Sequence, residues 1–326
     1  MRRRDFTIAL GGMALWPLAC GAQQRSVPVI GFMSGRSAGD SAHLVDAFRQ
    51  GLAAMGFVEG QNVTIEYRWA EGRYDRLQEF AADFVGRKVD AIVAGGATDA
   101  ARAAKDATVT IPIVFTFGSD PVEVGLVKSM ARPASNITGV TFIAEALNPK
   151  LLELARELVP NARVIAVLVN STNSTSKRQV RIVQDAASRT RVRLKILEAS
   201  TAAEIDAAFD TLGKSQVDGL IVVPEAFFMS RREQLASLAA RHAIPAVYGF
   251  REFVAVGGLI SYGASFAGVF RQVGNYAGKI LKGVKPGDLP ITQPTTFELV
   301  INVKAAKDLG ITIPLSILAR ADEVIE

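Results

Sequence analysis

The chain alternates short apolar runs with longer amphipathic stretches, and the order of these segments occurs twice. Residues 88–95 (KVDAIVAG) and 216–223 (QVDGLIVV) both pass from Val-Asp into an apolar run that is too short for a helix. Each is followed by a helical pattern and then by a second apolar run that begins with Ile-Pro, at 111–115 and 244–248. Short continuous apolar runs of this kind are typical of strands buried in a parallel sheet.

The repeat extends toward the N-terminus. VIGFMS at 29–34 corresponds to VIAVLV at 164–169, and NVTIEY at 62–67 corresponds to RVRLKIL at 191–197. The segments between these runs carry apolar residues at helical spacing, as at Leu44, Val45, Phe48, Leu52 and Met55. Alternating strands and helices predict an α/β fold with parallel sheets. The repetition favours two Rossmann-like lobes over the alternative, which is one large doubly wound sheet.

Composition and charge narrow the class of protein. The chain has 326 residues, of which 49% are hydrophobic, so it can bury a large core and form two domains. No apolar run approaches the ~20 residues that span a bilayer. The formal net charge is +5, and without the first five residues the remainder has 34 basic and 31 acidic residues. We therefore expect no nucleic-acid partner.

The N-terminal residues have the layout of an export signal, which we predict to cover 1–22. Arg2, Arg3 and Arg4 precede an apolar segment that is too short to span a membrane. Arg3-Arg4-Asp5-Phe6 resembles a twin-arginine signal, and an ordinary secretory signal is the alternative. We favour cleavage after Ala22, with lipidation of Cys20 as the other interpretation. Either signal predicts a periplasmic protein.

Polar residues follow the strands of both predicted sheets. In open parallel sheets, ligands bind beyond the carboxyl ends of the strands. We therefore expect the loops 95–98 and 224–226 to line one cleft from opposite sides. The candidate ligand-binding residues in these and the corresponding loops are Ser34, Gly96, Thr98, Asp120, Asn170, Glu225, Tyr248 and Tyr262.

These residue types point to a zwitterionic solute such as an amino acid. The hydroxyl of Thr98 and the N–H groups after Gly96 suit a carboxylate. Asp120 and Glu225 suit an ammonium group, and the two tyrosines suit an aromatic wall. The structural alternatives remain open: Thr98 and Asp120 as helix caps, Glu225 as a surface residue, and the tyrosines as packing.

The sequence gives little support for an enzyme. His43 and His242 are the only histidines and Cys20 is the only cysteine, so a His/Cys metal cluster cannot form. The chain has no Gly-x-Ser-x-Gly, no dinucleotide-binding glycine motif after the first strand and no phosphate loop. We expect no catalytic activity, no cofactor and no metal.

Four segments together resemble a known family. They are FTFGSDPVEVGLV (115–127), NITGVTF (136–142), LISYGASFAGVFRQVGNYAGKILKG (259–283) and FELVINVKAAKDLGITIP (297–314). Their order resembles that of ABC transporter substrate-binding proteins of the tryptophan/tyrosine-type group.

The resemblance implies a periplasmic binding protein of type I. In that architecture two lobes are joined by a three-crossover hinge, close around a small molecule and dock on membrane permease subunits. It carries over Thr98, Asp120, Asn136 and Thr138 as ligand-binding residues. The family commonly has an acidic residue after Ser-Tyr-Gly, whereas this chain continues with Ala264, Ser265 and Phe266.

The expected organisation and function follow from the repeat and the resemblance. We predict one lobe from 27–138 and about 264–292, and a second from 139–263 and about 293–326, with the lobe of the C-terminal tail left open. The expected function is an exported receptor of an ABC importer that captures an amino acid or similar carboxylate. The alternative is an exported receptor that senses its ligand and signals to a separate membrane partner.

Overall fold

The computed structural model describes residues 27–142 and 144–326 and shows two separate sheets. The first sheet has the order β2-β1-β3-β4-β5 and is entirely parallel. Its strands are β1 (Val29–Ser34), β2 (Thr64–Trp69), β3 (Ala91–Gly95), β4 (Ile113–Phe117) and β5 (Ile137–Thr141). In the first lobe this sheet is covered by α1 (Ala42–Ala54), α2 (Leu77–Gly86), α3 (Thr98–Ala107) and α10 (Phe266–Leu281).

The second sheet has the order β12-β11-β10-β9-β8-β6-β7. All its neighbours are parallel except the pair β10–β11. Its strands are β6 (Val164–Val169), β7 (Arg193–Glu198), β8 (Gly219–Val222), β9 (Ala246–Tyr248), β10 (Ile260–Ala264), β11 (Phe297–Asn302) and β12 (Glu323–Ile325). The helices of this second lobe are α4 (Asn148–Leu158), α5 (Ser176–Ala187), α6 (Ala202–Gly213), α7 (Ala226–Ser230), α8 (Arg232–Arg241), α9 (Arg251–Ala255), α11 (Val303–Asp308) and α12 (Leu315–Leu318).

The repeated Val-Asp pairs have the same structural role in both lobes. The Oδ2 atom of Asp90 accepts a hydrogen bond from the Val29 backbone N–H at 2.7 Å. The Oδ2 atom of Asp218 accepts from the N–H groups of Arg163 and Val164 at 2.7 and 2.9 Å. Each aspartate thus binds the backbone at the start of the neighbouring central strand. The predicted two-lobed α/β fold is confirmed, and within the described residues only the β10–β11 pair departs from parallel sheets.

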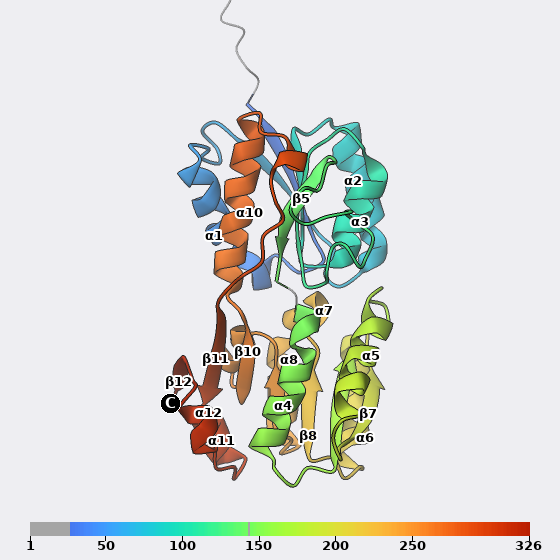
Figure 1. The fold of residues 1–326 in the computed structure, drawn as a ribbon, viewed down its shortest axis with the longest axis vertical. Helices are drawn as coiled ribbons and strands as arrows, with labels where there is room; N and C mark the ends of the chain where they lie inside the picture. The colour runs from blue at the N-terminus through green and yellow to red at the C-terminus, as the bar shows by residue number, and fades with distance from the viewer. Residues whose placement is uncertain (1–26, 143) are drawn as a thin grey trace, which may run out of the picture.

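The chain passes between the lobes three times (Figure 1). It leaves the first sheet after Thr141, returns between β10 and α10, and leaves again between Thr292 and Phe297. The boundary predicted between residues 138 and 139 is wrong, because it falls inside β5, which pairs with β4 as far as Thr141. The C-terminal tail joins the second sheet through β11 and β12.

Helix α10 belongs to the first lobe although about 220 residues separate it from α1, against which it packs. The two helices approach at Gly51, Gly274 and Gly278, where an added Cβ atom would collide with the facing helix. Among the described residues, no helix is both long and apolar enough to cross a membrane. The predicted export signal, including Cys20, lies outside these residues.

Candidate ligand-binding cleft

A cavity of about 30 Å³ lies between the carboxyl ends of the two sheets. This volume holds about two water molecules, so the lobes are in contact around it. We call this space the cleft. Residues of both lobes line it: Arg36, Gly96, Ala97, Thr98, Gly118, Ser119, Phe142, Glu145, Asn173, Thr175, Gln179, Pro224, Glu225, Ala226, Phe250, Phe266 and Phe270.

The loop that follows β3 forms one wall of the cleft. Gly96 has a φ of +81°, in the left-handed region that favours glycine. Its backbone turns the chain into α3, whose N-cap residue Ala97 provides no side-chain hydrogen bond. The hydroxyls of Thr98 and Ser119 are 2.9 Å apart. The first turn of α3 and two hydroxyls therefore face the same small space.

Glu145 connects the first crossover to both lobes. It lies in a 3₁₀ turn (Ala144–Leu147) and is 2% exposed. Its carboxylate accepts from the Ser119 hydroxyl and from Arg178 of α5, with the Arg178 Nε at 2.7 Å. Arg178 also pairs with Glu123. The sequence did not reveal Glu145, because its partners are 26 and 33 residues away.

Glu225 is a buried cap rather than a surface residue. Its carboxylate accepts from the N–H groups of Phe227 and Phe228 at 3.1 and 2.7 Å, at the start of α7. It also accepts from the Tyr74 hydroxyl of the first lobe at 2.7 Å and from the Asn170 side-chain amide at 3.4 Å. Burial raises the pKa of Glu225 despite these donors. The Tyr74–Glu225 hydrogen bond joins the two lobes.

Further side-chain contacts join the lobes beside the cleft. Arg232 of α8 pairs with Asp40 of the first lobe. His43 Nε2 of α1 is 3.3 Å from the Glu252 carboxylate of α9. These contacts hold the two lobes together around the small cavity.

Arg36 is a second cleft residue that the sequence did not reveal. It follows β1, is 2% exposed, and its guanidinium carbon lies 5.4 Å from the centre of the Phe266 ring. Burial lowers its pKa to about 10, so the side chain stays protonated at neutral pH. A basic residue in a strand-to-helix loop resembles many surface arginines, and only the fold buries it.

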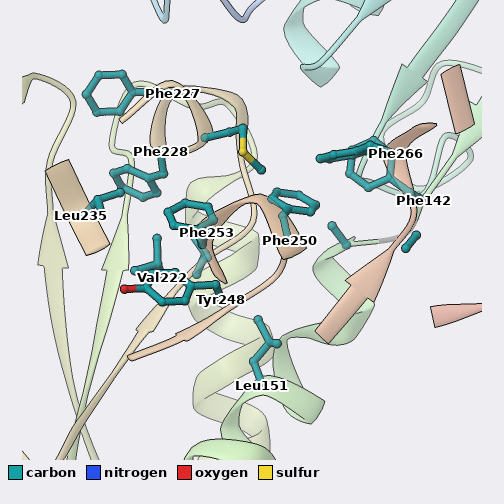
Figure 2. Close-up of a cluster of buried hydrophobic side chains, with 14 of the residues drawn as sticks. Phe142, Leu151, Val222, Phe227, Phe228, Leu235, Tyr248, Phe250, Phe253 and Phe266 are labelled. Atoms are coloured by element: carbon teal, nitrogen blue, oxygen red, sulfur yellow. The ribbon is translucent and has the colours of Figure 1, made fainter. Parts of the chain in front are cut away.

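Phenylalanine rings form the apolar part of the cleft. Figure 2 shows Phe142 and Phe266 close together, with Phe250 nearby. Their ring centres are 4.9 Å apart for Phe142 and Phe266, and 4.3 Å apart for Phe250 and Phe266. Phe142, Phe250 and Phe266 come from the first crossover, the loop after β9 and the start of α10. An apolar ligand group could contact residues of both lobes here.

Three of the candidate residues from the sequence line the cleft, namely Gly96, Thr98 and Glu225. Two others lie next to it. Asn170 donates to Glu225, and the buried Ser34 hydroxyl accepts from the Arg36 N–H at 3.2 Å. The expectation that the loops 95–98 and 224–226 face one another agrees with this arrangement.

Asp120, Asn136 and Thr138 do not line the cleft. Asp120 accepts from the N–H groups of Val122 and Glu123, as a turn cap. The Asn136 amide donates to the carbonyls of Thr108 and Ile111, and the Thr138 hydroxyl donates to that of Leu289. Asn136 and Thr138 lie at the amino end of β5 and ligands bind at the carboxyl end, so these two assignments are corrected.

Neither tyrosine predicted as an aromatic wall lies in the cleft. Tyr248 is 1% exposed and stacks on Phe253 in the interior of the second lobe, with ring centres 4.4 Å apart (Figure 2). Tyr262 of β10 stacks on Phe297 of the antiparallel neighbour β11. Both assignments are corrected, because the pleat of each strand directs the ring into packing. Within the described residues, no group of three or more His, Cys, Asp or Glu side chains could hold a metal ion.

The raised pKa of Glu225 predicts a specific pH dependence of stability. A carboxyl that binds its proton more tightly in the folded protein stabilises the fold below the unfolded pKa, and this contribution is lost as the pH rises through the folded pKa. We therefore expect the free energy of unfolding of the wild type to fall, relative to Glu225→Gln, as the pH rises above about 4.5.

Urea unfolding of both proteins at a series of pH values measures this difference. Every other titrating group is common to the two proteins. The difference between their free energies of unfolding therefore reports the titration of Glu225. A difference that is constant with pH, or that grows as the pH rises, would contradict the assignment.

The architecture is that of a two-lobed α/β protein with a small cavity between the lobes. A model of the family described as ABC transporter substrate binding protein matches residues 26–325. A tyrosine-binding protein of Clostridioides difficile (strain R20291) is 31% identical over 262 residues, which are 80% of this chain and 75% of the relative. The chain therefore belongs to the ABC transporter substrate binding proteins, which are solute-binding proteins and not enzymes.

Two solved structures show the same fold at similar identity. The ABC domain in complex with L-Trp from Streptococcus pneumonia is 28% identical with a TM-score of 0.81, covering 91% of this chain and 100% of that one. The ligand-free, open structure of a substrate binding protein with adhesive properties from Clostridium difficile is 27% identical with a TM-score of 0.65, covering 92% and 99%. The resemblance to the tryptophan/tyrosine-type group is thus confirmed.

Proposed function

We propose that this protein is the exported receptor of an ABC importer, which captures an amino acid or similar small carboxylate by closing two lobes around it. The lobes are residues 27–141 with 266–292, and residues 144–264 with 297–326. The observation that carries the proposal is the cleft itself, because polar and aromatic groups from both lobes converge there. Either lobe alone supplies only part of the polar partners that a buried charged ligand needs.

The size of the cleft and its contacts support hinge closure. A solute larger than two water molecules enters only when the lobes separate, and separation breaks the Tyr74–Glu225, Arg232–Asp40 and His43–Glu252 contacts. The higher TM-score with the L-Trp complex than with the ligand-free, open structure supports a closed arrangement here, since identity and coverage are nearly equal.

The chemistry of the relatives supports a carboxylate-bearing solute. One relative is named for tyrosine and another structure contains L-Trp. In this chain, Arg36 and the first turn of α3 offer donors to a carboxylate, and the phenylalanines offer contact area to an apolar group. Release of the solute to membrane permease subunits then requires the lobes to open.

A thermal-shift screen of the purified protein against amino acids, aromatic and aliphatic carboxylates, and amides tests the proposal. A solute at 100 times its Kd stabilises the folded protein by about 2.7 kcal/mol and raises the melting temperature. Small-angle X-ray scattering of each hit should show a smaller radius of gyration with solute than without. Binding without compaction would contradict closure, and the lack of any carboxylate hit would contradict the proposed solute class.

Tyr74→Phe tests the role of the contacts between the lobes. We expect this change to weaken binding and to enlarge the protein without ligand, because it removes a hydrogen bond across the cleft. Tyr276→Phe is the matched control: it removes a tyrosine hydrogen bond to the Pro290 carbonyl, away from the cleft. Equal effects of the two changes on solute affinity would count against the closure contacts.

A further inference from the structure

The cleft contains one buried cation whose hydrogen-bonding capacity is largely unused. Among the residues that the structure describes, the Arg36 Nε has no hydrogen-bond partner, and Nη2 reaches only the Asp40 carbonyl at 3.5 Å. A buried guanidinium without partners is costly. An oxyanion that enters the cleft can satisfy it, and a planar carboxylate matches its geometry.

Asp40 and Glu252, the carboxylates whose charges act on Arg36, each have another partner. Asp40 pairs with Arg232, and Glu252 pairs with His43. Within the described part of the chain, neither carboxylate forms an ion pair with Arg36 at 4.0 Å or less. The positive charge of Arg36 is therefore balanced only at longer range.

The carboxylates that line the cleft are already engaged. Glu145 accepts from Ser119 and Arg178, and Glu225 accepts from two backbone N–H groups, Tyr74 and Asn170. A ligand ammonium would have to compete with these donors. The cleft thus has a buried cation that lacks a close ion-pair partner, whereas its carboxylates already accept hydrogen bonds from other groups.

A second set of donors lies beside Arg36. The side chain of Arg36 passes along the Gly96 loop, where a Cβ atom on Gly96 would lie 3.0 Å from the Arg36 Cγ. This loop leads into the N-terminus of α3, which has no side-chain cap. The start of a helix attracts negative charge, and although Asp99 lies in the first turn of α3, an anion beside Arg36 would be close to both sets of donors.

The other residues that line the cleft favour a ligand with a flat apolar ring and one hydrogen-bond donor. Four phenylalanines line the cleft, and the Oε1 atom of Gln179, a residue 2% exposed, has no hydrogen-bond partner within the described residues. One neutral acceptor suits a hydroxyl or a ring N–H. It does not replace the several acceptors that a buried ammonium needs.

From these contacts we infer that the cleft takes an aromatic monocarboxylate that has no ammonium group beside the carboxylate. This inference rests on the proposed function, since it names the solute class of the same cleft. Arg36 and the start of α3 bind the carboxylate, the phenylalanines contact the ring, and Gln179 accepts a hydrogen bond from a ring hydroxyl or N–H.

Three probes that share one phenol ring test the inference by calorimetry on the wild-type protein. They are 3-(4-hydroxyphenyl)propionate, L-tyrosine and tyramine, which carry a carboxylate alone, both charges, and an ammonium alone. We expect the propionate to bind at least 10-fold more tightly than L-tyrosine, and tyramine to show no binding. L-tyrosine binding as tightly as the propionate, or more tightly, would overturn the inference and leave the proposed function intact.

The variant Arg36→Gln tests the residue that carries the argument. We expect it to weaken binding of the propionate at least 10-fold, whereas Arg271→Gln, an exposed arginine on α10 outside the cleft, leaves the affinity unchanged. An unchanged affinity in Arg36→Gln would overturn the inference. If that variant does not fold, calorimetry of the three probes with the wild-type protein still tests the inference. Failure of all three probes also overturns it, and the wider solute screen then decides the proposed function separately.

Discussion

Gly274→Ala should destabilise the protein by about 2 kcal/mol, although it adds only one methyl group. Gly274 lies where α10 crosses α1, and an added Cβ atom would collide with the Phe48 carbonyl oxygen and approach the Leu52 nitrogen. These are backbone atoms that cannot rotate away, so the two helices must separate. Overpacking of this kind costs about 1–3 kcal/mol or more, and exceeds the helix propensity that alanine adds.

The same substitution elsewhere on α10 is the control. A Cβ atom at the exposed Gly268 meets no atom within 4 Å. Gly268→Ala should therefore stabilise the protein by about 0.5–1 kcal/mol, because alanine is the better helix former. Equilibrium unfolding in urea measures both changes. Shifts of the same sign would show that close approach of α1 and α10 does not hold α10 in the first lobe.

Arg178→Met should destabilise the protein by about 3 kcal/mol. The change leaves the carboxylate of Glu145, which is 2% exposed, without its charged partner. Removing one partner of a buried ion pair costs about 3–5 kcal/mol, and we expect the lower value because the Arg178 side chain is 27% exposed. The loss is large because the buried carboxylate of Glu145 keeps its desolvation cost without a charged partner.

A double variant distinguishes the lost pair from lost packing. Glu145→Gln removes the buried charge, so Arg178→Met combined with Glu145→Gln should recover most of the stability that Arg178→Met loses. Arg87→Met, in a pair on the surface of α2, should change stability little. Urea titrations at neutral pH measure the free energy of unfolding of the wild type, the two single variants, the double variant and Arg87→Met. Additive effects of Arg178→Met and Glu145→Gln would contradict the coupling.

The candidate residues predicted from the sequence fall into groups according to the kind of evidence that suggested them. Gly96, Thr98 and Glu225 follow strands that the apolar pattern identified, and the rule for parallel sheets places such loops at one edge. Asn136 and Thr138 came from a motif match, which gives no information on the end of the strand that faces the ligand. Tyr248 and Tyr262 were assigned by residue type, which does not distinguish a ligand wall from a core.

Arg36 and Glu145 could not have been selected from the sequence. Each is an ordinary charged residue in a loop, with no motif around it. Arg36 becomes a buried cation because Phe266, 230 residues later, covers it. Glu145 becomes a buried and paired anion because Ser119 of one lobe and Arg178 of the other both contact its carboxylate. Burial and partner geometry, which set the cost of a charge, exist only in the folded chain.

Sequence by itself determined the two-lobed α/β fold, the repeat, and the loops that line the cleft, because apolar periodicity and short turn motifs are local properties. Tertiary structure decided that α10 returns to α1 and that β11 and β12 complete the second sheet. It also decided that the carboxylates in the cleft have hydrogen-bond partners, whereas the Arg36 guanidinium has unused donors. Those outcomes depend on groups far apart in the chain, whose desolvation and packing energies arise only in the folded chain.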